Sequence, residues 1–145
     1  FSEKQIRDMG RAAKGVRGIK LAKGDMVVGM QIFPPDIDKT GSTLLTVSVN
    51  GFAKRSEFNE YRIQSRGGKG IINMKVTEKT GIVVGIIAVL PEDEIMAVTK
   101  KGMVVRCPAQ DIRQSSRGTQ GVKLISMDKD DSLTSIANVV AREEE

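Results

Sequence analysis

Short runs of alternating apolar and polar residues recur along the chain. The alternation covers residues 28–32, 45–49 and 72–76, each with an apolar residue at every second position. A period of two over about five residues is the signal of a half-buried β-strand. The run 83–90 is apolar apart from Gly85, which predicts a strand buried on both faces.

Three segments of the chain match one another, which indicates internal repeats. Each reads Arg, three residues, Gly and then a β-branched residue. They cover residues 11–16, 66–71 and 117–122. A second match joins Asn50-Gly51 to Lys101-Gly102, because the Gly of each pair lies fifteen residues before the Arg of the following loop.

The spacing of these motifs predicts turns and domain boundaries. Asn50-Gly51 suits a type I′ hairpin turn, since both central residues of that turn need positive φ. Counting back from Arg11 places the corresponding hairpin of the first repeat before residue 1, so we expect the chain to begin inside a repeat. The predicted repeats and the acidic tail cover approximately 1–50, 51–101, 102–142 and 143–145.

The strand count predicts the fold class. About ten short strands, four to a repeat, indicate an all-β protein of propeller-like blades with four antiparallel strands each. Two and a half to three such blades make a partial ring. Helix should be minor, with single turns in residues 56–61 and 108–113, and the loop 34–42 should be an exposed excursion.

The amino-acid composition excludes several classes of function. The 145 residues include no His and one Cys, which excludes a His-based catalytic triad, an internal disulfide and a zinc site. No apolar run approaches the roughly 18 residues that span a membrane. The net charge is +5 and only 3% of residues are aromatic. Duplex nucleic acid or an acidic surface is therefore a better partner than unpaired bases, which stack on aromatic side chains.

The three Arg-x-x-x-Gly loops are the candidate phosphate-binding elements. In the loop 66–70, glycines would let backbone N–H groups approach a phosphate, while Arg and Lys supply charge. The opposing interpretation is that the glycines only shape the turn and that the arginine pairs with a neighbouring blade. The candidate DNA-binding residues are Arg66, Lys69, Gly67, Gly68, Gln64, Arg62, Lys54, Arg55, Arg11, Lys14, Arg17, Arg117 and Arg106.

These motifs resemble a known family. The run Gln64-Ser65-Arg66-Gly67-Gly68-Lys69-Gly70, with Asn50-Gly51-Phe52-Ala53-Lys54-Arg55 before it, is similar to the C-terminal domain of the bacterial DNA gyrase A protein. The resemblance implies a β-pinwheel, whose propeller-like blades exchange strands and whose basic perimeter wraps duplex DNA. It also implies an ATP-dependent type II topoisomerase as parent, located in the bacterial cytoplasm at the nucleoid. The expected partners are the rest of gyrase A and gyrase B.

By this resemblance the fragment itself is non-catalytic. The DNA-cleaving tyrosine and the sites for ATP and magnesium belong to other parts of the parent, so no cofactor is expected here. The family's box motif has Arg where this chain has Ser65, and it belongs to the first blade, so its essential role is not carried over. Two alternatives stay open: the corresponding domain of topoisomerase IV, and a propeller that binds proteins. A partial ring should also expose blade edges that favour self-association.

Overall fold

The computed structural model describes residues 1–139 and divides the chain into two compact units. Unit 1 comprises residues 1–27 and 61–71. Unit 2 comprises residues 28–60 and the chain from residue 72 onward. Within the described residues every strand lies in unit 2 and every helix is a single 3-10 turn, so the predicted all-β class is confirmed. The acidic tail lies outside the described residues.

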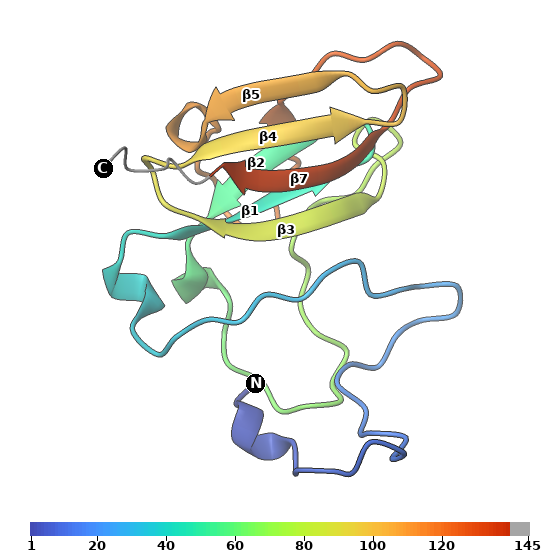
Figure 1. Cartoon of the computed structure of the whole chain (residues 1–145), viewed down its shortest axis with the longest axis vertical. Coiled ribbons are helices and arrows are strands. Elements are labelled where there is room, and N and C mark those ends of the chain that lie inside the picture. Colours follow the sequence, from blue (N-terminus) through green and yellow to red (C-terminus); the bar gives the residue numbers. More distant parts are fainter. Residues whose placement is uncertain (140–145) are drawn as a thin grey trace. The chain divides into compact units, whose positions relative to one another are not determined.

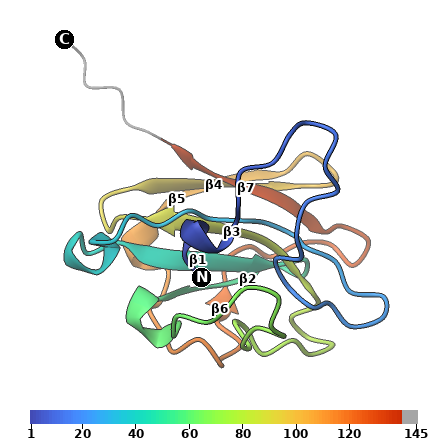
Figure 2. The same cartoon turned by 90° about the horizontal axis from the view of Figure 1, so that it is seen from below.

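Unit 2 consists of two antiparallel sheets, seen as separate layers in Figure 2. The first has the order β3-β1-β2-β6 and contains β1 (Thr43–Ser48), β2 (Phe52–Ser56), β3 (Val83–Val89) and β6 (Val122–Lys123). The second has the order β5-β4-β7 and contains β4 (Glu94–Thr99), β5 (Val104–Pro108) and β7 (Leu133–Val139) (Figure 1).

Both sheets contain the same three-stranded arrangement. β1 pairs with β2 and β3, and β4 pairs with β5 and β7. The register shifts once in each: between Val47 and Ser48 against β3, and between Val98 and Thr99 against β7. β6 follows the third Arg-x-x-x-Gly loop and adds to the first sheet beside β2. The repeat is therefore visible in the strand pairing, while the boundaries given for the three repeats stay a prediction.

The turn at Asn50-Gly51 differs from the predicted type I′ turn. Gly51 has a φ of +78°, but no residue other than glycine has a positive φ in the described chain. The Gly51 N–H donates to the Ser48 carbonyl at 3.0 Å, which closes a three-residue hairpin loop. The Asn50 amide is instead used to bind two backbone carbonyls of the segment before β3. The Gly102 N–H donates to the Thr99 carbonyl at the same distance, so the second hairpin has the same turn hydrogen bond.

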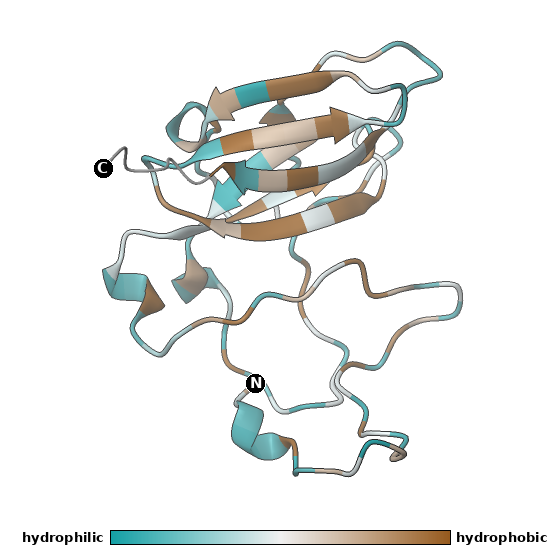
Figure 3. Cartoon of the chain, viewed as in Figure 1, coloured by the Kyte–Doolittle hydropathy of each residue, from teal (hydrophilic) through white to brown (hydrophobic). Residues whose placement is uncertain are grey.

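One hydrophobic core lies between the sheets and draws on both of them. Leu45, Val47, Ile95 and Leu133 are each at most 1% exposed and belong to this core. Figure 3 shows the hydrophobic colouring along β3 and β4. β3 also lies close to β7, since a Cβ at Gly85 would be 3.3 Å from the Ile136 side chain.

Two of the predicted strands are wrong. Residues 28–32 and 72–76 contain no strand, and Met30 and Ile32 are 82% and 77% exposed. Alternation determines which side chains share a face, but it does not supply the neighbouring backbone that a strand needs. The described chain accordingly has seven strands instead of about ten. β3 is half-buried and not buried on both faces as predicted, because it is at the edge of its sheet.

Four single helical turns complete the described elements. η3 (Phe58–Glu60) and η4 (Ala109–Asp111) lie in the two places where helix was predicted. η1 (Glu3–Gln5) lies 55 residues before η3, so the first repeat has the same turn. η2 (Ile37–Lys39) belongs to the loop 34–42, which is largely exposed, as predicted.

Gly121 is the last residue of the third loop and lies against β2. We expect Gly121→Ala to lower the free energy of unfolding by about 1–3 kcal/mol. Its φ is +76°, and a Cβ at this position would overlap the Ala53 carbonyl. Urea denaturation followed by far-ultraviolet circular dichroism measures the loss. Gly118→Ala is the matched control, because no atom lies within 4 Å of its Cβ position. Equal stability of the two variants would contradict this account of the loop.

Candidate nucleic-acid interface

Unit 1 concentrates the positive charge of the chain. It carries ten Lys and Arg against three Asp and Glu, whereas the described part of unit 2 carries twelve of each. The ten bases are Lys4, Arg7, Arg11, Lys14, Arg17, Lys20, Lys23, Arg62, Arg66 and Lys69. Unit 1 is therefore the candidate nucleic-acid interface.

Most of these charges face solvent and lack a carboxylate partner. Nine of the ten residues are exposed, and Arg66 is half-buried. The ion pairs of the described chain all lie in unit 2: Lys39–Asp36 at 2.9 Å, Lys101–Asp130 at 2.7 Å, and Arg106–Glu94. Ion pairs within residues 1–139 therefore do not neutralise the surface of unit 1.

Hydrogen bonds from Arg66 hold the second loop in place. Its backbone N–H donates to Gln5 Oε1 at 2.8 Å, and its Nε donates to the Gln5 carbonyl at 3.2 Å. Its Nη1 donates to the Arg17 carbonyl at 2.6 Å. One side chain thus joins three segments of unit 1. The opposing interpretation of the sequence, that this arginine is structural, fits these contacts, although the acceptors are a glutamine and backbone carbonyls and not a carboxylate.

The rest of the second loop offers groups that suit an anion. The Gly67 N–H donates to the Gly18 carbonyl at 2.7 Å, and the Lys20 N–H donates to the Gly68 carbonyl at 2.8 Å. Within the described residues no hydrogen bond is donated by the N–H groups of residues 68–70, and Lys69 is exposed. Free N–H groups and an exposed ammonium group are donors that suit an anion. Gln64, just before the loop, is half-buried.

The third loop repeats this construction in unit 2. Arg117 donates its N–H to Glu60 Oε2 at 2.7 Å and its Nη1 to the Ile72 carbonyl at 2.6 Å. The Lys75 N–H donates to the Thr119 carbonyl at 3.0 Å, matching the contact of Lys20 in unit 1. The third loop lacks a lysine, so it holds the arginine contacts of the second loop but not its free charge.

Lys54 lies inside unit 2 and is not accessible to a phosphate. Its side chain is fully buried, and its Nζ donates to Ser56 Oγ at 2.9 Å and to the carbonyls of Ser116 and Arg117 at 3.1 and 2.6 Å. An ammonium group has three donors, so none is left. Burial lowers the pKa of Lys54 to about 8, and the opposing charge of Glu60 restores only part of it. Lys54 therefore supports the third loop.

Arg55 and Arg106 also have partners within unit 2. Arg55 is 8% exposed, and it donates to the carbonyls of Ile112 at 2.8 Å and Gln110 at 3.4 Å. Burial lowers the pKa of its guanidinium group. Arg106 is exposed but pairs with Glu94 across the β4–β5 ladder. We do not propose Lys54 or Arg55 as DNA contacts.

The remaining basic candidates all belong to unit 1. Arg11, Lys14, Arg17 and Arg62 are exposed and lie in unit 1 together with the second loop. Sequence reasoning missed the part played by Gln5, which accepts the Arg66 N–H. The signal for it was present, since Gln5 lies 55 residues before Glu60, the same spacing that separates the first two loops.

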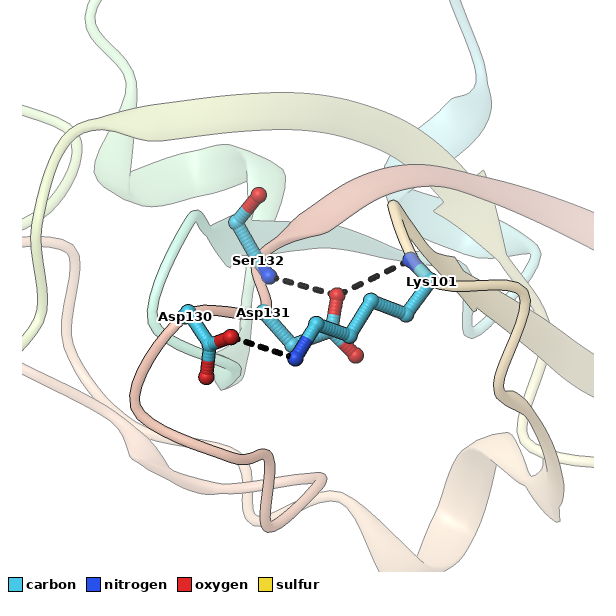
Figure 4. A network of polar contacts seen from close by, with 4 residues as sticks. All are labelled: Lys101, Asp130, Asp131 and Ser132. Atoms are coloured by element: carbon cyan, nitrogen blue, oxygen red, sulfur yellow. Dashed lines mark hydrogen bonds and ion pairs between the residues drawn. The ribbon is translucent and has the colours of Figure 1, made fainter.

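The hairpin tip at Lys101 is neutralised by acids of the turn before β7 (Figure 4). The Lys101 ammonium group pairs with Asp130, and its backbone N–H donates to Asp131 Oδ1 at 3.0 Å. The Ser132 N–H donates to the same oxygen at 2.8 Å. Desolvation alone would raise the pKa of Asp131. The pKa is nevertheless lowered overall, because Asp131 accepts these two hydrogen bonds and a third from Thr99 and lies near the Lys101 charge. The charge of Lys101 is therefore neutralised, while Lys100 is exposed.

Cys107 behaves as a packing residue. It is half-buried against the core, and burial together with the Asp111 charge raises the pKa of its thiol. Among the described residues no cluster of three or more acids and cysteines has a geometry for holding a metal ion. No helix in the same part of the chain has the length and apolar character needed to cross a membrane.

Comparison with known proteins identifies the family. A family model described as "DNA gyrase C-terminal domain, beta-propeller" matches residues 1–34, 42–89 and 93–139. The DNA gyrase A protein of Staphylococcus aureus is 41% identical over 140 residues, and that of Staphylococcus epidermidis is 39% identical over 139 residues. Each alignment covers 96% of this chain but only 15% of the relative, so the chain spans a small part of these proteins.

Solved structures agree with this assignment. A structure of the DNA gyrase A C-terminal domain matches with a TM-score of 0.81 and 29% identity, covering 95% of this chain and 45% of that one. A C-terminal domain of DNA topoisomerase IV has a TM-score of 0.84 at 21% identity, covering 94% and 42%, which shows a shared fold. The repeated Arg-x-x-x-Gly loops, the paired antiparallel sheets and the three matched segments place this chain in the DNA gyrase A C-terminal domain family of β-pinwheels.

Proposed function

We propose that this chain binds duplex DNA without sequence specificity through the exposed bases of unit 1. The observation that carries the proposal is the set of nine exposed Lys and Arg in unit 1, none of which forms an ion pair within the described residues. Family membership supports it, because the relatives are components of a DNA-handling enzyme by name. Membership also suggests that the chain supplies the DNA-wrapping module of a gyrase.

The mechanism is electrostatic and geometric. Lys and Arg side chains replace condensed counterions along the phosphate backbone and make no use of base identity. Wrapping bends the duplex, and bending a site of about 20–30 bp by about 40–90° costs roughly 1–6 kcal/mol, which the phosphate contacts must offset. In the whole enzyme, the wrapped segment would present a second DNA segment for ATP-dependent strand passage and negative supercoiling.

The remaining proposals concern the parent protein. We infer that it works with gyrase B in the bacterial cytoplasm at the nucleoid, and that ATP and magnesium act in its other domains. The topoisomerase IV alternative has less support, since the relatives at about 40% identity are gyrase A proteins.

A protein-contacting role, including self-association, is suggested by one surface feature. Met30 and Ile32 lie in a segment of unit 2 that forms no strand, and they are 82% and 77% exposed. Exposed apolar side chains on an unpaired segment favour contact with another chain. Light scattering over a concentration series tests this, and a monomer at all concentrations would contradict self-association.

A salt titration on duplex DNA tests the proposed function. With four to six phosphates neutralised, log K should fall with log salt at a slope of about −4 to −5. Two duplexes of unrelated sequence should give the same affinity, because the contacts are to phosphate. Absence of duplex binding at about 50 mM salt would contradict the proposal for this chain.

A further inference from the structure

The backbone N–H of the arginine in the second and in the third loop is bound by the last residue of a 3-10 turn. In unit 1, Arg66 N–H donates to the Gln5 side chain, which ends η1. In unit 2, Arg117 N–H donates to the Glu60 carboxylate, which ends η3. The acceptor is neutral in one unit and charged in the other, so what is shared is the hydrogen bond and not the charge.

The guanidinium group of Arg66 and that of Arg117 each donate to the segment that follows the preceding loop. Arg66 donates to the carbonyl of Arg17, which lies six residues after Arg11. Arg117 donates to the carbonyl of Ile72, which lies six residues after Arg66. Both distances are 2.6 Å. We call this pair of contacts, made by a loop arginine to the preceding repeat, the arginine clasp.

The clasp uses guanidinium donors of Arg66, whereas Lys69 of the same loop is exposed. Arg66 uses its Nε and Nη1 on carbonyls of two segments, Gln5 and Arg17, so its planar fork spans both. A planar fork with fixed donor directions can make both contacts, whereas an ammonium group on a flexible stem makes point contacts. Lys69 is exposed three residues later. The charge that is available to a ligand therefore belongs to Lys69.

We propose that Arg66 is a positioning residue for DNA binding: through the clasp it fixes the second loop, so that Lys69 and the free N–H groups of residues 68–70 meet a phosphate. Arg117 makes the same clasp in unit 2, where the loop lacks the lysine and the clasp only joins successive repeats. The DNA part of this inference rests on the proposed function. The clasp itself is independent of it.

Three variants of the full chain separate positioning from direct contact. Arg66→Lys keeps the charge but removes the fork, and Gln5→Ala removes an acceptor without changing any charge. We expect both to weaken duplex binding about 3–10-fold with an unchanged salt slope, because the same phosphates are contacted by a looser loop. Lys69→Gln should instead reduce the slope by about 0.9, the loss of one phosphate contact. Lys129→Gln, at an exposed lysine of unit 2, is the charge control and should leave binding unchanged.

Amide hydrogen exchange in the absence of DNA tests the clasp separately. The N–H groups of Gly67 and Lys20 bind carbonyls across the clasped loop. Their exchange should accelerate at least about tenfold in Arg66→Lys and Gln5→Ala, but not in Lys69→Gln. Unchanged exchange in Arg66→Lys overturns the clasp. Accelerated exchange with wild-type DNA affinity in both clasp variants overturns the positioning role. Accelerated exchange with no duplex binding by the wild-type chain confirms the clasp and rejects the DNA proposal.

Discussion

Replacement of Lys54 by Met is expected to lower the free energy of unfolding of unit 2 by about 1–3 kcal/mol at pH 7. The substitution keeps an apolar stem of similar length but removes three hydrogen bonds, two of them to the carbonyls of Ser116 and Arg117. After the substitution, these two carbonyls would lie beside β2 without the hydrogen bonds that Lys54 donates. Removal of the buried charge relieves some desolvation, so the expected loss is smaller than the full value of three charged hydrogen bonds.

The same variant has a predicted pH dependence. The pKa of Lys54 falls from 10.5 to about 8 on folding, so between these values the unfolded chain binds more protons than the native chain. Stability contributed by this group therefore rises as the pH increases from about 8 to 10.5. Because Lys54→Met cannot titrate, the difference in unfolding free energy between wild type and variant should be larger at pH 10 than at pH 7.

Urea denaturation followed by far-ultraviolet circular dichroism measures both effects, since the described strands all belong to unit 2. Lys75→Met is the matched control: Lys75 is exposed, and its replacement should change stability by less than about 0.5 kcal/mol. A Lys54→Met chain as stable as wild type at pH 7 would show that desolvation of the ammonium group outweighs its hydrogen bonds. A constant difference across the pH range would show that its pKa is not lowered.

The sequence predicts the repeating parts of the fold because these parts carry local signals. The hairpin glycines mark the turns of β1–β2 and β4–β5, and the repeated loops mark equivalent positions 51 residues apart. The strand predicted at 28–32 fails for a non-local reason. Its alternation matches a strand, but no neighbouring backbone pairs with it in the described chain, so its apolar side chains are exposed.

The sequence shows which candidate residues are charged, but it does not show which of them are buried. Arg11, Lys14 and Arg17 are exposed as a basic loop region should be. Lys54 and Arg55 are buried because the segment 110–117 lies over their side chains and accepts their hydrogen bonds. Sequence cannot show that the third loop folds over β2, since the contact joins residues about 60 positions apart in the chain.

The sequence alone also does not show the charge asymmetry between the two units. Unit 1 joins residues 1–27 to residues 61–71, which are separated by a segment with four acids and three bases. A count along the chain shows only that the first half is the more basic. The fold collects ten bases and three acids into one unit, which makes the DNA proposal specific to a surface.

The second large effect is expected from removing charge in unit 1. Neutralising four exposed bases, Arg11, Lys14, Arg17 and Lys20, to Gln should weaken duplex binding by about 10³-fold at about 0.1 M salt. Each base that contacts a phosphate contributes about 0.9 to the salt slope. Glutamine preserves polarity and most of the length of these side chains. None of the four side chains supplies a hydrogen bond found in the described chain, so stability should change little.

The matched control removes the same charge from unit 2, by replacing the exposed residues Lys75, Lys100, Lys123 and Lys129 with Gln. Both variants lower the net charge by four, so a difference between them reports the location of the contacts and not the overall charge. The most direct measurement is the salt slope of duplex binding for the wild type and the two variants. The account predicts a slope smaller by about 3–4 for the unit 1 variant and an unchanged slope for the unit 2 variant. Equal losses in the two variants would contradict it.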